Sequence, residues 1–473
     1  MKKTAYISTS IPYVNGAPHI GFALEAMQAD TLKRWYALNG YDTFLSAGTD
    51  ENAIKNVEAA EKLKMTTQEL VDQLSERFLK LRDTLNFSYD RFIRTTDEKH
   101  IRGSQKFWKL CEHDIYKKSY EGLYCVGCET FYKDGQFPDN ICPEHNRKLE
   151  IVSEVNYFFN LSNYLPKIKE LISSGEVKIM PEFRKNEVLQ MLESDLGDFS
   201  ISRPTERTKG WGIPVPGDDT QRIYVWFDAL INYITTLDFA DDGEMYKKFW
   251  QNNPKRIHIV GKDIIKFHAI YWTGMLLSAK LPLPTNIFVH GFINAEGKKM
   301  SKSLGNVLSP YDLVEKYGTD ALRYYFLREI PSLDDGDFSF SRMEEIYNSE
   351  LANELGNLVM RITTLSEKDG IDVKHKTQKS IYSDEINGLF EQYQFNKILE
   401  HIWLQIKSTN KSTDEFAPWK KTPEERKQFL IKSLATINHI GYQLVPFMPQ
   451  TAEKIVQATQ GTIKKIQPLF PKK

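Results

Sequence analysis

A turn at residues 11–22 joins a strand-like segment to a helix-like segment and constrains the fold more than any other feature. Residues 4–9 alternate in β-favouring types, and residues 23–30 are typical of a helix. Ligands of an open α/β sheet bind where its strands end, and Gly21 would let a nucleotide approach the backbone. His19 could contact a phosphate there. Alone, however, this turn favours the simpler interpretation of a surface histidine, so a partner motif is needed.

The same strand-then-turn pattern recurs along the chain. Residues 41–47 predict a second strand, residues 89–95 a third, and residues 223–233, 256–261 and 286–292 predict that the sheet resumes. Asp50 would then project into the same crevice, where a carboxylate can hold an ammonium group or a ribose hydroxyl. An equally favoured alternative is that Asp50 caps a helix that begins near Asn52.

Length and composition limit the class of protein. A chain of 473 residues predicts about three domains. Its 62 basic and 63 acidic residues nearly cancel, so bulk charge indicates no nucleic-acid partner, although a local basic face stays possible. The start lacks an apolar signal region, and no later stretch approaches 18 uncharged apolar residues. We therefore expect a cytoplasmic protein without a membrane span or a disulfide framework.

Three of the four cysteines lie in one segment with the spacing of metal ligands. Cys125 and Cys128 are followed by Cys142 and His145, which gives C-x2-C-x13-C-x2-H. Three thiolates and one imidazole can close a tetrahedral zinc site, and a closed site has a structural role. The alternative, unrelated thiols that cluster by chance, is less compatible with both spacings. Cys111 lies outside the pattern, and we expect it to be buried.

Two later features suit a ligand pocket and a phosphate site. Trp226, Tyr233 and Phe267 are spaced either as core residues or as walls of an apolar pocket. Residues 297–306 place Lys298, Lys299 and Lys302 in a loop with two serines, which suits a triphosphate. A solvated basic loop is the simpler alternative, but the pairing with the His19 turn favours phosphate binding.

Two motifs carry a family resemblance. His19-Ile20-Gly21-Phe22 resembles the HIGH motif of class I aminoacyl-tRNA synthetases, and residues 299–303 are identical to their KMSKS motif. In this order around a cysteine-rich insertion, they resemble the methionyl-tRNA synthetase family over essentially the whole chain. The resemblance implies an α/β fold: a Rossmann-type parallel-sheet catalytic domain with a zinc-bearing insertion, followed by an all-α helical-bundle anticodon-binding domain.

The resemblance also implies domain boundaries. The halves of the catalytic domain are expected at 1–118 and 218–297, with a connective insertion at 119–217 whose zinc knuckle spans 125–145. A KMSKS loop and stem-contact linker is expected at 298–340, and the anticodon domain at 341–473. We expect no appended domain after residues 446–449, and a monomer.

The resemblance assigns residues to three sites. It implies that Asp50 holds the substrate ammonium in a methionine pocket formed by Ile11, Tyr13, Asp50, Trp226, Ala229, Leu230, Tyr233, Asp263, Ile264 and His268. The ATP site would comprise Pro18, His19, Gly21, Lys299, Met300, Ser301, Lys302 and Ser303. His19, Lys299 and Lys302 would stabilise the phosphates, and Arg203 would aid ATP activation. The tRNA anticodon would be read by Asn353, Asn357, Arg361 and Trp419.

The implied reaction is methionine activation by ATP and transfer to tRNA(Met), initiator tRNA included, with Mg²⁺ bound alongside ATP and homocysteine edited in the same site. Phe22 stands where the family usually has a second histidine, and Asn52 and Ala53 stand where it commonly has His-Gly. Phe22 cannot donate to a phosphate, so either the remaining cations suffice or a group such as Asn52 compensates. A nucleotidyl-transferring relative and a catalytically silent tRNA-binding paralogue are the alternatives.

Overall fold

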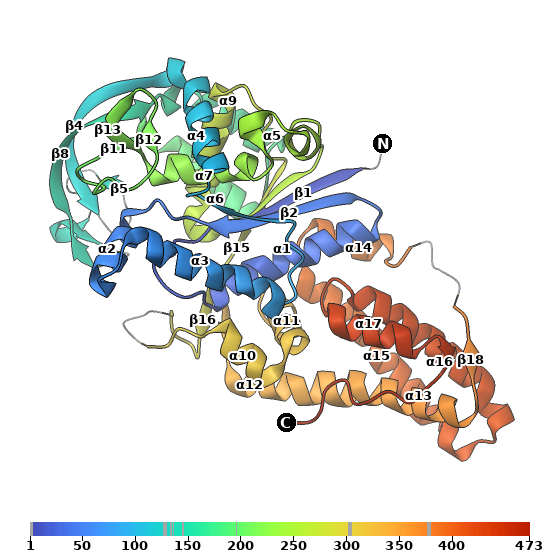
Figure 1. The fold of residues 1–473 in the computed structure, drawn as a ribbon. Helices are drawn as coiled ribbons and strands as arrows, with labels where there is room; N and C mark the ends of the chain where they lie inside the picture. Colours follow the sequence, from blue (N-terminus) through green and yellow to red (C-terminus); the bar gives the residue numbers. More distant parts are fainter. Residues whose placement is uncertain are drawn as a thin grey trace.

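The computed structural model describes residues 3–125, 130–132, 135, 137–143, 146–194, 196–300, 305–375 and 380–473. An α/β part built on a parallel sheet is joined to an elongated helical part, and α1 (Ile20–Leu38) lies between the sheet and the helices (Figure 1). Among the helices described, none is long and apolar enough to cross a membrane. The architecture agrees with the α/β and all-α parts expected from the sequence.

The central sheet has six strands, all parallel, in the order β3-β2-β1-β14-β15-β9. Their bounds are β1 Thr4–Thr9, β2 Asp42–Thr49, β3 Arg91–Arg94, β9 Lys178–Met180, β14 Arg256–Gly261 and β15 Asn286–His290. Five of these strands coincide with predicted ones. The predicted insertion at 119–217 contains the sixth, β9, which pairs with β15 at the sheet edge.

Each face of the sheet packs against its own hydrophobic core, because alternate side chains of a strand point to opposite faces. Ala5 and Ile7 of β1 pack with α1 and α3 (Thr67–Thr84). Tyr6 packs on the other face with α4 (Glu98–Leu110), α7 (Val225–Thr235) and α9 (Thr273–Ser278). Both faces are therefore covered, as expected for a parallel sheet.

The prediction of a strand at residues 223–233 is wrong, because the segment forms helix α7. Every residue of α7 except Trp226 is buried. A helix that is apolar on all sides has no 3.6-residue periodicity, so its sequence cannot be told from a buried strand. The short β13 (Asp218–Ile223) precedes it.

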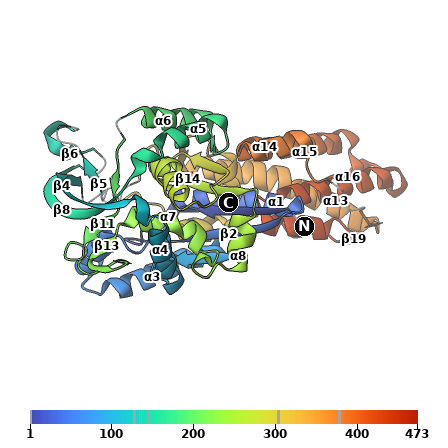
Figure 2. The same cartoon turned by 90° about the horizontal axis from the view of Figure 1, so that it is seen from above.

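A long two-stranded ribbon extends from the α/β part. β4 (Ile115–Cys125) pairs antiparallel with β8 (Glu150–Phe159). Figure 2 shows this ribbon at the end of the molecule opposite α13, α15 and α16. The smaller strands around it are β5 Thr130–Tyr132, β6 Ile141–Cys142, β7 Arg147–Lys148, β10 Phe199–Ser200, β11 Ser202–Pro204 and β12 Pro214–Val215.

The remaining helices of the α/β part connect and cover these strands. They are α2 Ile54–Leu63, α5 Leu165–Ser174, α6 Glu182–Glu193 and α8 Glu244–Tyr246, with π-helical turns at Lys247–Gln251 and Phe267–Trp272. β16 (Ile293–Ala295) pairs with β17 (Gly336–Phe338). The helices α10 (Pro310–Tyr317) and α11 (Thr319–Arg328) lie between these two strands in the sequence.

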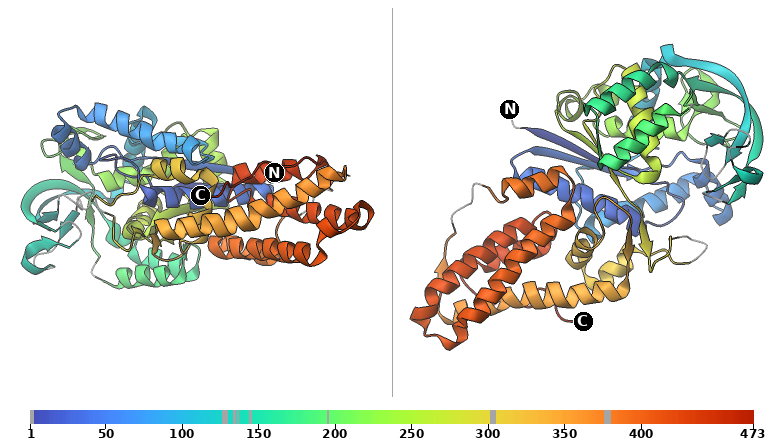
Figure 3. Two further views of the ribbon diagram at one scale, coloured as in Figure 1. Left: turned by 90° about the horizontal axis from the view of Figure 1, so that it is seen from below. Right: turned by 180° about the vertical axis from the view of Figure 1, so that it is seen from behind.

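The C-terminal part is helical, as its amphipathic pattern predicts. Its elements are α12 Phe340–Ile346, a π-helical segment Tyr347–Gly356, α13 Asn357–Lys368, α14 Asp384–Glu391, α15 Phe395–Phe416, α16 Pro423–Leu444 and α17 Pro449–Ala458, with β18 Asp372–Val373 paired to β19 Gly461–Thr462. α13, α15 and α16 pack together and run away from the sheet (Figure 3).

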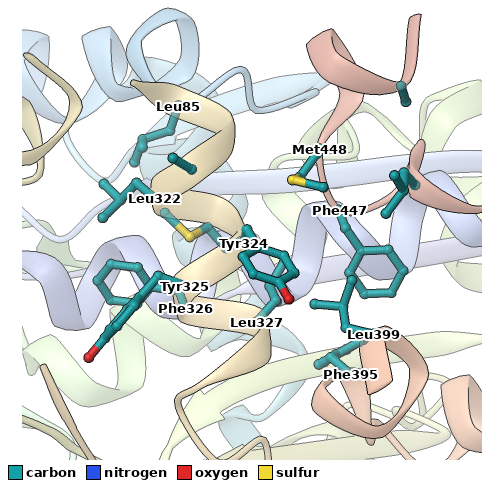
Figure 4. Close-up of a cluster of buried hydrophobic side chains, with 14 of the residues drawn as sticks. Leu85, Leu322, Tyr324, Tyr325, Phe326, Leu327, Phe395, Leu399, Phe447 and Met448 are labelled. Atoms are coloured by element: carbon teal, nitrogen blue, oxygen red, sulfur yellow. The ribbon is translucent and has the colours of Figure 1, made fainter. Parts of the chain in front are cut away.

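The two parts meet at α11. Figure 4 shows Tyr324 and Leu327 of α11 near Leu399 and Phe447 of the helical part. Beside them the fully buried Arg323 donates to Asp30 of α1 at 2.7 Å and to the carbonyl of Phe447 at 2.8 Å. A buried charge held by a carboxylate and carbonyls fixes one geometry, so the helical part is tied directly to the helix that begins at the His19 turn.

Candidate active site

The turns after β1 and β2 are hydrogen-bonded to each other. Asp50 donates from its backbone nitrogen to Pro12 O at 2.9 Å and accepts from Val14 N at 3.4 Å. Tyr13 and Asp50 thus form a parallel bridge that continues the sheet beyond its strands. The residue that caps α2 is Ala53, without a side-chain hydrogen bond, so the alternative role of Asp50 as that cap is excluded. Asp50 is 2 % exposed and faces the side on which ligands of such sheets bind.

Aromatic rings form a wall beside Tyr13. Trp226 stacks on Phe267 with ring centroids 3.8 Å apart and an interplanar angle of 5°, and it meets Tyr13 edge-on at 6.3 Å. Trp226 and Phe267 are both partly exposed, unlike core aromatics. Tyr233 is instead a core residue, so the three aromatic residues divide between the two interpretations, and the wall formed by Trp226 and Phe267 stays a prediction.

Tyr233 and His268 form the buried base of this wall. The hydroxyl of Tyr233 lies 2.6 Å from Nε2 of His268, whose Nδ1 lies 2.8 Å from the carbonyl of Ile264. A carbonyl only accepts, so Nδ1 carries the proton and Nε2 accepts from Tyr233. Burial lowers the pKa of His268 to about 4, and the imidazole is neutral at pH 7. Burial raises the pKa of Tyr233 well above its usual value.

The other predicted pocket residues lie on the same elements. Ala229 and Leu230 are buried on α7, and Ile264 packs against the core around His268. Ile11 lies over Gly48 of β2, where a Cβ would come within 3.1 Å of the Ile11 side chain and 2.2 Å of the Ile93 carbonyl. Glycine is therefore needed at residue 48 so that β2 can lie this close to Ile93 and Ile11.

His19 stands exposed at the start of α1. Its Nδ1 accepts from Gly21 N at 3.1 Å and caps the helix. A Cβ on Gly21 would lie 2.9 Å from the ring, so Gly21 permits this conformation of His19. Ile20 N donates to Leu308 O at 3.2 Å, and this bond brings the end of the lysine-rich loop to the same helix start.

The described part of the lysine-rich loop begins with a tight turn. Ala295 and Lys298 exchange backbone hydrogen bonds at 2.9 and 3.2 Å, and Asn306 donates to Lys299 O at 3.1 Å. Lys299 is exposed, with Nζ 5.8 Å from the centre of the Phe292 ring. Met300 is partly buried against the core. Ser301, Lys302 and Ser303 lie outside the described residues.

Three polar residues near the ends of β14 and β15 escaped the sequence analysis. His290 donates to Glu25 at 2.9 Å, and Glu25 also accepts from the backbone and hydroxyl of Ser10 at 2.7 Å each. Burial opposes protonation of His290, but the hydrogen bond and charge of Glu25 raise its pKa. Lys262 lies over the Phe292 ring at 4.5 Å, on the ring that Lys299 also approaches. Only the order of strands in the sheet brings these residues together, and no local pattern signals it.

Asp263 and Arg203 lie on different elements. Asp263 is exposed just after β14, and its Oδ1 lies over Gly261 beside His290. Arg203 is buried at the base of the ribbon, donates to Ser200 Oγ at 2.8 Å and lies 4.0 Å over the Tyr224 ring. The role of Arg203 in ATP activation stays a prediction.

Comparisons with known proteins show which family the chain resembles. The family model for class I tRNA synthetases of the M type matches residues 5–150 and 139–363. A methionine–tRNA ligase of Caldanaerobacter subterraneus subsp. tengcongensis is 41 % identical over 97 % of this chain and 74 % of its own length. One from Thermotoga maritima is 39 % identical over 95 % of this chain and 74 % of its own.

A solved structure agrees. Mycobacterium tuberculosis methionyl-tRNA synthetase in complex with methionyl-adenylate is 34 % identical, with a TM-score of 0.91 over 99 % of this chain and 100 % of that one. The chain belongs to the class I methionyl-tRNA synthetase family. The family resemblance predicted from the two motifs is thus confirmed.

The two departures from the family motifs have structural explanations. Phe22 is 7 % exposed and packs edge-to-face on Phe78 of α3, with ring centroids 5.2 Å apart. Asn52 donates to Asp228 at 2.7 Å and to Thr95 O at 3.1 Å. Phe22 is therefore a core residue in this member of the family, and the amide of Asn52 is engaged with Asp228.

Two of the four predicted zinc ligands are described. Cys125 ends β4 and Cys142 lies in β6, and both are buried in one small cluster with Leu123 and Leu149. Cys128 and His145 lie outside the described residues. Within the described residues no group of three or more histidine, cysteine or acidic side chains could hold a metal. Cys111 is buried as predicted, and burial raises the pKa of its thiol to about 12.

The predicted anticodon residues lie at the far end of the helical part. Arg361 of α13 pairs with Asp414 of α15 at 2.6 Å and lies over the Trp419 ring at 5.0 Å. Trp419 is 48 % exposed. Asn353 is exposed. It lies about one helical turn before Asn357 and about two turns before Arg361. Their predicted role in a synthetase of this family fits a ring available for base stacking.

Proposed function

We propose that the protein activates L-methionine with ATP and transfers the methionyl group to tRNA(Met), for initiation and elongation of translation. One observation carries the proposal: Tyr13 forms a backbone bridge with the buried Asp50 and meets the ring of Trp226, which stacks on Phe267, so a carboxyl group and aromatic rings are brought together. A carboxylate can hold the α-ammonium group, and aromatic rings make favourable contacts with a thioether. The names of the relatives agree with this substrate.

The first reaction step needs no general base. The methionine carboxylate is ionised at neutral pH and attacks the α-phosphorus of ATP in line, so that pyrophosphate leaves and methionyl-adenylate remains. Exposed His19 and Lys299, together with Lys302, supply positive charge and hydrogen-bond donors to the phosphates. Mg²⁺ bound with ATP would neutralise further phosphate charge.

The second step transfers the methionyl group to tRNA. The 2′-hydroxyl of the terminal adenosine attacks the adenylate carbonyl, and AMP leaves. The pocket distinguishes methionine from shorter side chains by about one methylene, worth roughly 1 to 3 kcal/mol, which is too little for accurate translation. Editing of homocysteine to its thiolactone in the same site therefore belongs to the proposal.

A structural zinc ion would be held by Cys125, Cys128, Cys142 and His145. The burial of Cys125 and Cys142 in one cluster supports this assignment, as does the donor set of three sulfurs and one nitrogen. Elemental analysis of protein purified without chelator should find one zinc per chain, and its absence would contradict the site. A cytoplasmic monomer with the domain boundaries given above completes the proposal.

The decisive experiment is methionine-dependent ATP–pyrophosphate exchange with purified protein and Mg²⁺, without tRNA. We expect exchange with methionine but not with leucine or valine. The absence of exchange from folded, zinc-loaded protein would favour the catalytically silent tRNA-binding paralogue. ATP–pyrophosphate exchange in the absence of any amino acid would favour the nucleotidyl-transferring alternative.

Binding of tRNA is tested at Trp419. A Trp419→Ala variant should bind tRNA(Met) about tenfold or more weakly in a gel-shift assay, because base stacking contributes about 1 to 3 kcal/mol. The variant should keep its pyrophosphate exchange rate. Leu404→Ala on α15 is the matched control, since Leu404 is an exposed apolar residue outside the predicted anticodon set. Unchanged tRNA affinity in Trp419→Ala would remove this residue from the site.

A further inference from the structure

A series of hydrogen bonds connects the turn that carries Asp50 with the helix that carries the apolar wall. Asn52, two residues after Asp50, donates from Nδ2 to Oδ2 of Asp228 at 2.7 Å. Asp228 lies on α7 between Trp226 and Ala229 of the predicted pocket. The bond spans 176 residues of sequence and directly joins the polar and apolar halves of the pocket.

Asp228 is held on its other side by α4. Its Oδ1 contacts Nε2 of His100 and lies 3.5 Å from Ser104 Oγ. Nδ1 of His100 is 2.8 Å from Thr235 Oγ1 in the last turn of α7. His100, Ser104 and Asp228 are all fully buried. The first and last turns of α7 are therefore both anchored to α4, and Asn52 connects this group to the turn of Asp50.

The turn itself has a second anchor that does not involve α7. Glu51 is buried and accepts hydrogen bonds from Arg94 at 2.8 and 2.9 Å and from Thr49 at 2.8 Å. These bonds fix the turn to β2 and β3 but leave its distance from α7 to other contacts. Asn52 supplies a direct bond from this turn to α7, because Oδ2 of Asp228 accepts a hydrogen bond from its Nδ2.

We infer that Asn52 and Asp228 form a positioning pair, whose hydrogen bond sets the distance between the ammonium-binding carboxylate of Asp50 and the thioether-binding wall on α7. The inference rests on the proposed function, since it concerns how methionine is held. It also explains why the family's histidine can be replaced here, because asparagine and histidine can each donate one hydrogen bond to a carboxylate.

The test compares the two substrates of the exchange reaction. In Asn52→Ala, the KM for methionine should rise about tenfold, while the KM for ATP and kcat stay within twofold. Asn52→His should restore the methionine KM to within threefold of the wild-type value. Asn438→Ala is the matched control: Asn438 is a buried asparagine of α16 that donates to Thr459 at 3.0 Å, and its loss should leave both KM values unchanged.

An exchange of the two groups tests the bond itself. Asn52→Asp alone puts two carboxylates side by side and should raise the methionine KM further than Asn52→Ala does. Adding Asp228→Asn restores one amide opposite one carboxylate, so the double variant should bind methionine more tightly than Asn52→Asp alone. Such coupling between neighbours is what a double-mutant cycle measures.

Three results would overturn the inference. A methionine KM that is unchanged in Asn52→Ala would remove the positioning role. Equal increases in the KM for methionine and for ATP, together with a lower unfolding temperature, would show a merely structural role. If wild-type protein shows no methionine-dependent exchange, the proposed function fails and the inference fails with it. If wild-type protein is active but Asn52→Ala keeps its methionine KM, only the inference fails.

Discussion

The two halves of the crevice are built differently. On the predicted methionine side, Tyr233, His268 and Asp50 are buried, and Tyr233 and His268 are bound to each other. On the nucleotide side, His19 and Lys299 are exposed. A pocket that selects a thioether by shape needs walls that do not move, whereas phosphates need charge and donors that can reach them. If the predicted sites are correct, buried and hydrogen-bonded side chains lie on the methionine side and exposed cations on the ATP side.

This difference predicts different costs of substitution. A buried, hydrogen-bonded side chain contributes to folding as well as to binding, so its loss should lower both the stability and the methionine affinity. An exposed cation contributes little to folding, so its loss should lower the reaction rate alone. Measurements that combine stability with kinetics can therefore confirm or break the comparison.

The largest effect is expected for Lys299→Ala. Removing one group that stabilises developing phosphate charge should lower the adenylation rate by about 10² to 10³. The methionine KM and the unfolding temperature should change little, because Lys299 is exposed. Lys298→Ala, at the neighbouring exposed lysine, is the control and should keep most of the rate. A large loss of methionine affinity in Lys299→Ala would contradict the division between the two halves. The same result is expected for Lys302→Ala.

Acid should destabilise the methionine side next. The pKa of His268 falls from its usual 6.5 to about 4 through burial, so between these pH values the unfolded chain binds a proton that the folded chain does not. The stability therefore decreases as the pH falls from 6.5 towards 4, by about 3 kcal/mol. His258, which burial also shifts downward, acts in the same direction.

For His290 the sign is opposite. The pKa of His290 is raised, so its contribution to the free energy of unfolding is present at low pH and is lost as the pH rises through the folded-state value.

The test concerns His268. Denaturant unfolding at pH 7 and pH 4.5 should show a smaller acid-induced loss of stability in His268→Gln than in wild-type protein. The exposed His113 provides the control His113→Gln, which should retain the full loss. Equal acid losses in all three proteins would contradict the assignment.

Tyr233→Phe should have a smaller effect on stability. It removes the hydroxyl that donates to His268 and leaves a buried imidazole nitrogen without that donor, at a cost of about 1 to 3 kcal/mol. The methionine KM should increase while the ATP KM does not. Tyr116→Phe is a suitable control, because its hydroxyl bonds to Asp198 at the exposed edge of the ribbon. A variant as stable as the wild type would show that this side is less rigid than the geometry indicates.

The elements predictable from sequence were those with a local signal. Strands β1 and β14 follow alternating or β-branched patterns, and the turn signals after β1 and β2 place Tyr13 and Asp50 side by side. Helix α7 was misassigned because it is buried on nearly all sides and so lacks a polar face, and β9 was missed because a three-residue edge strand has too little pattern.

The missed site residues depend on long-range packing. Glu25 and His290 are 265 residues apart and meet because β15 lies two strands from β1 in the sheet order. The sequence offered Phe267 as either a core residue or a wall residue, and the stacking on Trp226 that bears on this choice is seen only in the structure. Strand order and ring contacts are tertiary facts that a single sequence does not encode in any short window.

The smallest effect on the reaction is expected for Phe22→His, which restores the usual family residue. Phe22 is buried against Phe78 beneath the helix start, so a histidine in the same place would lose apolar contacts without reaching the phosphates. The exchange rate should stay within twofold of the wild-type value while the unfolding temperature falls. Phe22→Leu, which keeps the site apolar, should lose less stability. A tenfold faster Phe22→His enzyme would show instead that residue 22 faces the nucleotide, and that the exposed half of the crevice extends further into α1 than the packing on Phe78 indicates.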